Sequence, residues 1–123
     1  MKFNKVELTA ILSMVHLMVI ADGKVKDEEI SVISSEAAKF GISPQEFGEI
    51  FTKAKDMESA YAVEIISKMT FEQRKYVAAY LGTVMAIDDD IDDTEIALWR
   101  LLSQMCGLPS MTVGEAICYI SER

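Results

Sequence analysis

The chain has 123 residues, of which 50% are apolar and 26% are charged. This length fits one domain with one core, and the apolar fraction excludes a disordered chain. The formal net charge of −8 argues against binding to nucleic acids or anionic membranes, because both are themselves negatively charged, and it favours cationic or metal partners.

The first predicted helix covers about residues 3–21, and its middle section is apolar on nearly every side. This pattern is typical of a central, buried helix. Lys2 and Lys5 precede the apolar stretch at residues 8–21, as they would in a signal peptide. However, no small-x-small cleavage site follows, and the stretch is too short to span a bilayer. We therefore expect a cytoplasmic protein without a membrane span.

Two further helices are predicted after a turn at residues 21–26. One covers about residues 27–40, with Asp27 as its N-cap and Gly41 as the left-handed residue that ends it. The sequence Ser43-Pro44-Gln45-Glu46 then predicts the start of a third helix, because serine and glutamate at this spacing form a capping box.

A linking helix is predicted at about residues 56–68, and a second set of three helices follows it. A capping box at Thr70 opens a helix that runs through Met85, and an acidic turn separates it from a helix at residues 93–106. Gly107 and Pro109 end that helix, and the sequence Thr112-Val113-Gly114-Glu115 opens a short last one. No window has the period-two alternation of a strand.

The two sets of helices are an internal repeat. Over residues 11–42, a shift of the chain by 66 positions superimposes five identical pairs: Asp22 and Asp88, Asp27 and Asp93, Glu29 and Glu95, Ile30 and Ile96, and Gly41 and Gly107. We therefore predict a single all-α domain over residues 1–123, a bundle of about seven helices with repeat units at about 3–54 and 70–122. Packing of the two central helices would give pseudo-twofold symmetry and bring the two acidic turns together.

In each unit an apolar helix leads into a turn that contains aspartate, and a glutamate follows that aspartate by seven residues. The first copy reads Ala21-Asp22-Gly23 with Glu29, and the second reads Ile87-Asp88-Asp89-Asp90 with Glu95 and lacks the glycine. By this motif, and over nearly its whole length, the chain resembles the TerB-like family, which is named for tellurite resistance. Related domains occur in larger proteins such as the DjlA co-chaperone.

This resemblance implies an acidic, all-α protein of the bacterial cytoplasm that is linked to tellurite resistance and to stress responses. It also implies a divalent cation on acidic residues, which in this chain map to Asp22, Glu29, Asp88 and Glu95. The family has no established catalytic activity, so we do not expect an enzyme. The expected partners are proteins, such as other stress-response components.

The acidic turns themselves allow two interpretations. Residues 88–95 carry six acids and no base. In the first interpretation, Asp22 and Asp88 form Asx-turns with backbone N–H groups just downstream, in solvated loops. In the second, the carboxylates of both turns converge on a hard cation, which prefers oxygen ligands, with Asp90 and Asp92 as helpers.

Other candidate residues favour structural roles. An EF-hand at the second turn is excluded, because Asp93 stands where that loop needs glycine and Trp99 where it needs glutamate. His16 is interpreted as a packed residue at the core or its edge, Cys106 as a core residue, and Trp99 as a core residue or the centre of a partner groove. Five methionines at helical positions are interpreted as core residues: Met14, Met18, Met69, Met85 and Met105.

Two alternatives to a cation-binding protein stay open. The first is a metal-free interaction module, which would use its acidic surface for a basic partner or an apolar groove for a partner helix. The second is a hydrolase with paired carboxylates, although two carboxylates alone specify no reaction. The sequence shows no phosphate-binding loop, nucleophile elbow or Ser/His/Asp set.

Overall fold

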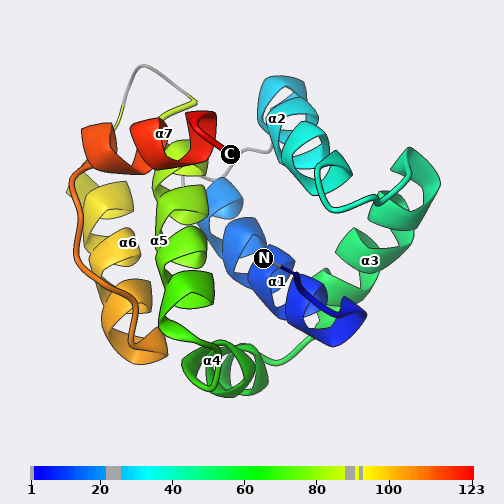
Figure 1. The fold of residues 1–123 in the computed structure, drawn as a ribbon, viewed down its shortest axis with the longest axis horizontal. Coiled ribbons are helices and arrows are strands. Elements are labelled where there is room, and N and C mark those ends of the chain that lie inside the picture. Colours follow the sequence, from blue (N-terminus) through cyan, green and yellow to red (C-terminus); the bar gives the residue numbers. More distant parts are fainter. Residues whose placement is uncertain (1, 22–25, 88–90, 92) are drawn as a thin grey trace.

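The computed structural model describes residues 2–21, 26–87, 91 and 93–123. Within these residues the chain folds as one all-α domain of seven helices, without a strand (Figure 1). The predicted fold class is therefore confirmed. Across the same residues, no helix combines the length and the apolar character needed to cross a membrane.

The helices follow the predicted order, with a linking helix between two sets of three. They are α1 (Lys5–Ile20), α2 (Asp27–Ala38), α3 (Pro44–Asp56), α4 (Ser59–Ser67), α5 (Phe71–Met85), α6 (Asp93–Cys106) and α7 (Val113–Ser121). The linking helix α4 is shorter than the predicted 56–68, because α3 continues through Asp56 before the chain turns.

Local capping explains most of the helix starts. Complete capping boxes open four helices, formed by Asn4 and Glu7, Ser43 and Glu46, Thr70 and Gln73, and Thr112 and Glu115. The prediction of Asp27 as an N-cap is wrong. Lys26 holds that position without a side-chain cap hydrogen bond, and Asp27 is the first helical residue, where the helix dipole still favours its charge.

Two glycines end helices as predicted. Gly41 and Gly107 adopt φ angles of +78° and +67°, which only glycine takes readily. After α6, the Leu108 N–H donates to the Ser103 carbonyl at 2.8 Å, which is the long hydrogen bond of a Schellman motif. The chain thereby reverses and runs back along α6 toward α7.

The core is built around α1 and α5, the first helices of the two units. Met14 and Val15 of α1 and Val77 and Leu81 of α5 are fully buried. The two helices contact each other, so their predicted packing is confirmed. Helices α3 and α4 pack on α1, and α6 and α7 pack on α5, while α2 contacts α5 and α6 contacts α1. Each unit thus covers part of the other unit's central helix.

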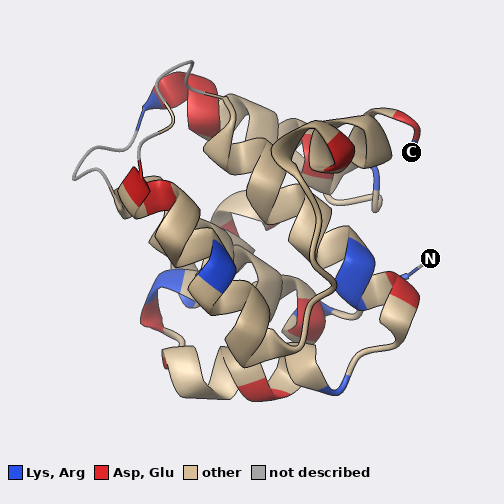
Figure 2. Cartoon of the chain, turned by 90° about the vertical axis from the view of Figure 1, so that its left-hand side faces the viewer, with Lys and Arg blue, Asp and Glu red and all other residues tan. Residues whose placement is uncertain are grey.

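Acidic residues gather where two helices begin. Figure 2 shows Asp and Glu at the first turns of α2 and α6, and both turns lie at the end of the molecule where α1 and α5 also end (Figure 1). The dipole of each helix is positive at its first turn, so acids are favoured there.

The methionines and the tryptophan that were predicted to lie in the core are buried, with one exception. Four of the five methionines and Trp99 are buried. Met105 is 48% exposed, so its interpretation as a core residue is wrong. It lies one helical turn beyond Leu101, which is 52% exposed, on the outward face of α6.

Candidate functional site

Two glutamates occupy equivalent positions at the starts of α2 and α6. Glu29 lies in the first turn of α2 and Glu95 in the first turn of α6. They are only 7% and 8% exposed, whereas their neighbours Glu28 and Asp93 are exposed. The helix dipole favours an acid anywhere in the first turn, so it does not explain why these two side chains are buried.

Burial distinguishes these two carboxylates from the acids on the surface. A carboxylate removed from water is stable only when neighbouring groups compensate its charge, and both glutamates interact with residues around them. They start helices that begin at the same end of the molecule (Figures 1 and 2). Two buried carboxylates at one end suit a hard cation, because such ions prefer oxygen ligands.

The other predicted ligands are Asp22, Asp88, Asp90 and Asp92, and all four lie outside the described residues. The structure therefore places only the two glutamates of the predicted set, and the approach of the two turns stays a prediction. In the ranges that the structure describes, no three His, Cys, Asp or Glu side chains gather as a metal site. A cation at this end would thus need ligands from the turns as well.

A third buried acid joins α2 to α5, and the sequence analysis missed it. Glu36 is 6% exposed and accepts a hydrogen bond of 2.8 Å from the Tyr76 hydroxyl. Its other carboxylate oxygen pairs with Lys39 Nζ at 3.0 Å. One turn along α5, the Tyr80 hydroxyl donates to the Ile33 carbonyl at 2.9 Å. Two tyrosines of one unit thus hold the second helix of the other.

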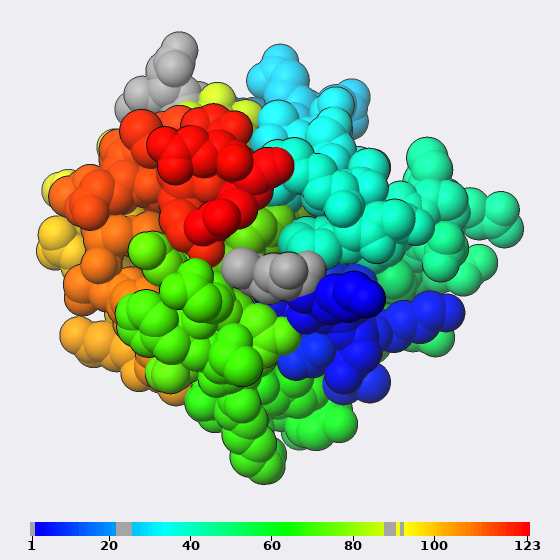
Figure 3. Space-filling view, in the orientation of Figure 1, coloured from blue at the N-terminus to red at the C-terminus, as the bar shows by residue number. Residues whose placement is uncertain are grey.

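Aromatic packing encloses this contact. The rings of Phe3 and Phe40 lie 5.6 and 5.3 Å from the ring of Tyr76. Figure 3 shows α2 (cyan) between α7 (red) and the N-terminal residues (blue) on the face toward the viewer. Burial, followed by the hydrogen bond to Glu36, raises the pKa of Tyr76 well above its ordinary value. The phenol therefore stays protonated, and the cluster serves to hold α2 on α5.

The single histidine and the two cysteines lie in three different environments. His16 is half-buried and packs edge-on against Phe51, with ring centres 5.9 Å apart, as expected for an edge histidine. Burial, with a contribution from Lys55, lowers the pKa of His16. Cys106 is fully buried, and burial raises the pKa of its thiol to about 11. Cys118 is exposed on α7.

No family model and no curated protein matches the chain. A solved structure does: PG1108, a protein of unknown function from Porphyromonas gingivalis W83, is 47% identical to this chain. The match covers 100% of this chain and 99% of that one, with a TM-score of 0.88. The chain belongs to the same family as this Porphyromonas protein. This relationship supports the fold over the full length of the chain, and it indicates no activity, because the function of that protein is unknown.

Proposed function

We propose that this protein is a TerB-like stress-response protein of the bacterial cytoplasm that binds a divalent cation at its paired acidic helix turns. The observation that carries the proposal is the burial of Glu29 and Glu95 at equivalent positions of the two units. Two observations support the proposal further: the acidic motif is repeated in the sequence, and α2 and α6 begin at the same end of the molecule.

The two glutamates would bind the cation from the starts of α2 and α6. Asp22 and Asp88, with Asp90 and Asp92 as helpers, would supply further oxygens from the turns outside the described residues. A cation bound there would offset the repulsion among the acids of residues 88–95 and cross-link the two repeat units. Its effect would therefore be to stabilise one arrangement of the two units.

Calorimetry of the metal-free protein tests the proposal. We expect one of Ca²⁺, Mg²⁺, Mn²⁺ or Zn²⁺ to bind with saturable heat at one ion per chain, because a single site shared by both units takes one ion. Glu29→Gln and Glu95→Gln should each weaken binding by about tenfold or more, because each removes a charged ligand and keeps the side-chain shape.

Matched controls separate a site from general attraction to an acidic surface. Glu28→Gln and Asp93→Asn remove exposed charges at the same two helix starts and should change the affinity little. Equal losses in the control and test variants would show diffuse attraction only. The absence of heat with all four ions, or two independent ions per chain, would contradict the shared site.

A second candidate function is a metal-free protein-interaction module, and the outward face of α6 favours it. Leu101 and Met105 are 52% and 48% exposed one turn apart, and Leu98 lies half-buried one turn before them. Such a stripe at helical spacing suits a partner helix, and the acidic surface would select a basic one.

A binding assay in chelator distinguishes this candidate from the first. Co-purification of a partner from native cells should persist without divalent cations and should be lost in the Leu101→Gln, Met105→Gln double variant. A partner that is released by chelator, or retained by the double variant, would contradict an apolar, metal-free interface on α6.

A further inference from the structure

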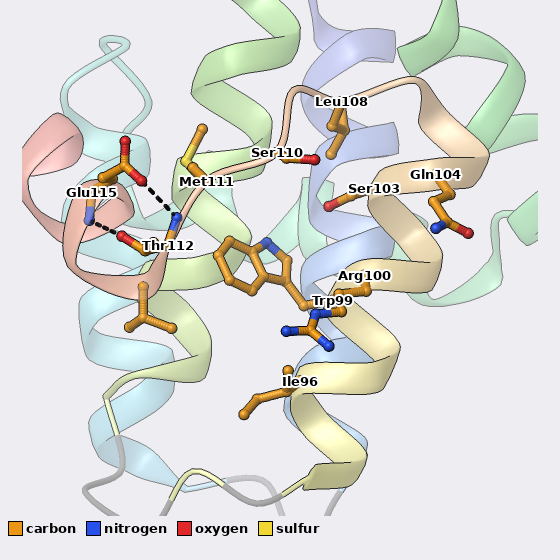
Figure 4. A pocket seen from close by; sticks show the side chains of 11 residues that line it. Ile96, Trp99, Arg100, Ser103, Gln104, Leu108, Ser110, Met111, Thr112 and Glu115 are labelled. Carbon is orange, nitrogen blue, oxygen red and sulfur yellow. Dashed lines mark hydrogen bonds between the residues drawn. The ribbon is translucent and has the colours of Figure 1, made fainter.

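A cleft separates α6 from the segment that runs back along it toward α7. Its volume is about 700 Å³, which lies within the range of small-molecule sites. Ile96, Trp99, Arg100 and Ser103 line it from α6, and Met111 and Val113 line it from the returning segment and the start of α7 (Figure 4). None of these residues belongs to the proposed cation site.

The floor of the cleft is a fixed aromatic ring. Trp99 is 6% exposed, and its indole N–H donates to the Ala78 carbonyl of α5 at 3.1 Å. Because its only polar group is occupied, the ring offers apolar surface to the cleft. Gly82 of α5 approaches the ring so closely that a Cβ atom built on it would lie 2.7 Å from Trp99 Cζ2, so the ring has no room to move toward α5 there.

The walls are apolar and partly open. Ile96, Met111 and Val113 are half-buried and pack at the edge of the core. An apolar ligand body placed over Trp99 would therefore remove further apolar surface from water. The thioether of Met111 adapts readily to different ligand shapes.

One cation stands at the mouth of this apolar cleft. Arg100 is exposed, and Figure 4 shows its guanidinium beside the Trp99 side chain, on the side of Ile96. Within the described ranges no carboxylate forms an ion pair with Arg100. Among the described residues that line the cleft, Glu115 is the one acid, and it already accepts a hydrogen bond of 3.0 Å from the Thr112 backbone N–H. That bond lowers the pKa of Glu115, so the side chain is ionised and engaged in its capping box.

We propose that this cleft binds a small apolar monocarboxylate. Its hydrocarbon body would lie over Trp99 between Ile96 and Met111, and its carboxylate would pair with the Arg100 guanidinium. A planar guanidinium forms strong, paired hydrogen bonds with a carboxylate. The ionised Glu115 and the chain's net charge of −8 would repel a doubly charged phosphate more strongly than a single carboxylate.

Fluorescence tests this proposal directly, because Trp99 is the only tryptophan in the chain. The probes are octanoate, octan-1-ol and octylamine, which share one hydrocarbon chain and differ in the charge of the head group. Octanoate should change the Trp99 emission in a saturable way at lower concentration than octan-1-ol. Octylamine should bind more weakly than octanoate, because Arg100 at the mouth of the cleft repels its ammonium group.

Variants assign the effect to Arg100. Arg100→Gln should weaken octanoate binding by about tenfold and leave octan-1-ol binding unchanged, because only octanoate uses the charge. Lys53→Gln, which removes one positive charge from α3, is the matched control and should change neither. Equal affinity of the three probes, octanoate binding unaffected by Arg100→Gln, or no saturable binding of octanoate by fluorescence and calorimetry would each overturn the proposal.

Discussion

The close approach of three helices at Gly82 predicts a strong effect from adding a single methyl group to this residue. A Cβ atom on this residue of α5 would lie 2.7 Å from Trp99 Cζ2 of α6 and 2.9 Å from Ala116 Cβ of α7. Carbon atoms in contact prefer about 3.5–4.0 Å, so Gly82→Ala would force α6 and α7 away from α5. Overpacking of this kind lowers the free energy of unfolding by about 1–3 kcal/mol.

Thermal unfolding followed by circular dichroism measures this loss, and Gly48→Ala is its control. Gly48 is exposed in the middle of α3, and nothing lies within 4 Å of a Cβ built there. The control should raise stability by up to about 1 kcal/mol, because alanine favours helix more than glycine does. At about 4 °C per kcal/mol for a domain of this size, the two variants should shift Tm in opposite directions. An unchanged or higher Tm for Gly82→Ala would refute the packing argument.

Three further predictions concern single side chains. Tyr76→Phe should lower the free energy of unfolding by about 1–3 kcal/mol in a denaturant titration, because it removes a hydrogen bond to a buried carboxylate. In the same titration, the control Tyr61→Phe on the exposed face of α4 should change the free energy of unfolding little. A thiol reagent at pH 8 should label Cys118 in the native protein and Cys106 only after unfolding, because Cys106 is buried with a pKa of about 11; labelling of both in the native state would contradict this. The pKa of His16 is lowered in the folded protein, so the unfolded chain binds a proton at this residue more readily. The stability of the wild type relative to His16→Gln should therefore fall as the pH drops through 6.5, the ordinary pKa of histidine. A difference that stays constant with pH would show that His16 does not contribute.

The parts of the fold that depend on neighbouring residues could be predicted from the sequence. A capping box links residues three apart, and a left-handed glycine depends only on its own backbone. Ser43, Thr70 and Thr112 therefore marked helix starts correctly, and Gly41 and Gly107 marked helix ends correctly. Asp27 misled because an acid is favourable both as an N-cap and as the first helical residue, and the sequence does not distinguish the two.

Contacts between distant residues could not be predicted in this way. Glu36 and Tyr76 are 40 positions apart, and no local pattern marks Glu36 as the buried partner of a tyrosine. Gly82 is required by its approach to Trp99, and its equivalent in the first unit is His16, so the repeat gives no sign of that contact. Met105 follows helical spacing, which fixes its neighbours on α6 but not whether another helix covers them.

The candidate site depends both on local sequence patterns and on contacts between distant residues. The sequence identified Glu29 and Glu95 through the repeat and the family resemblance, and the structure adds that both are buried. Their burial distinguishes them from Glu28 and Asp93, which have the same charge and nearly the same place in the sequence. Periodicity did not separate these residues, because burial in a first turn depends on which other helices lie beside it.

The melting temperature in chelator, and then with each divalent cation added back, tests the central claim most directly. A site filled at one hundred times its Kd stabilises the fold by about 2.7 kcal/mol, which corresponds to a rise of about 10 °C for a domain of this size. We predict such a rise with one cation, and its loss in Glu95→Gln and in Asp88→Asn. An equal Tm with every cation and with chelator would contradict a cation site at the paired turns.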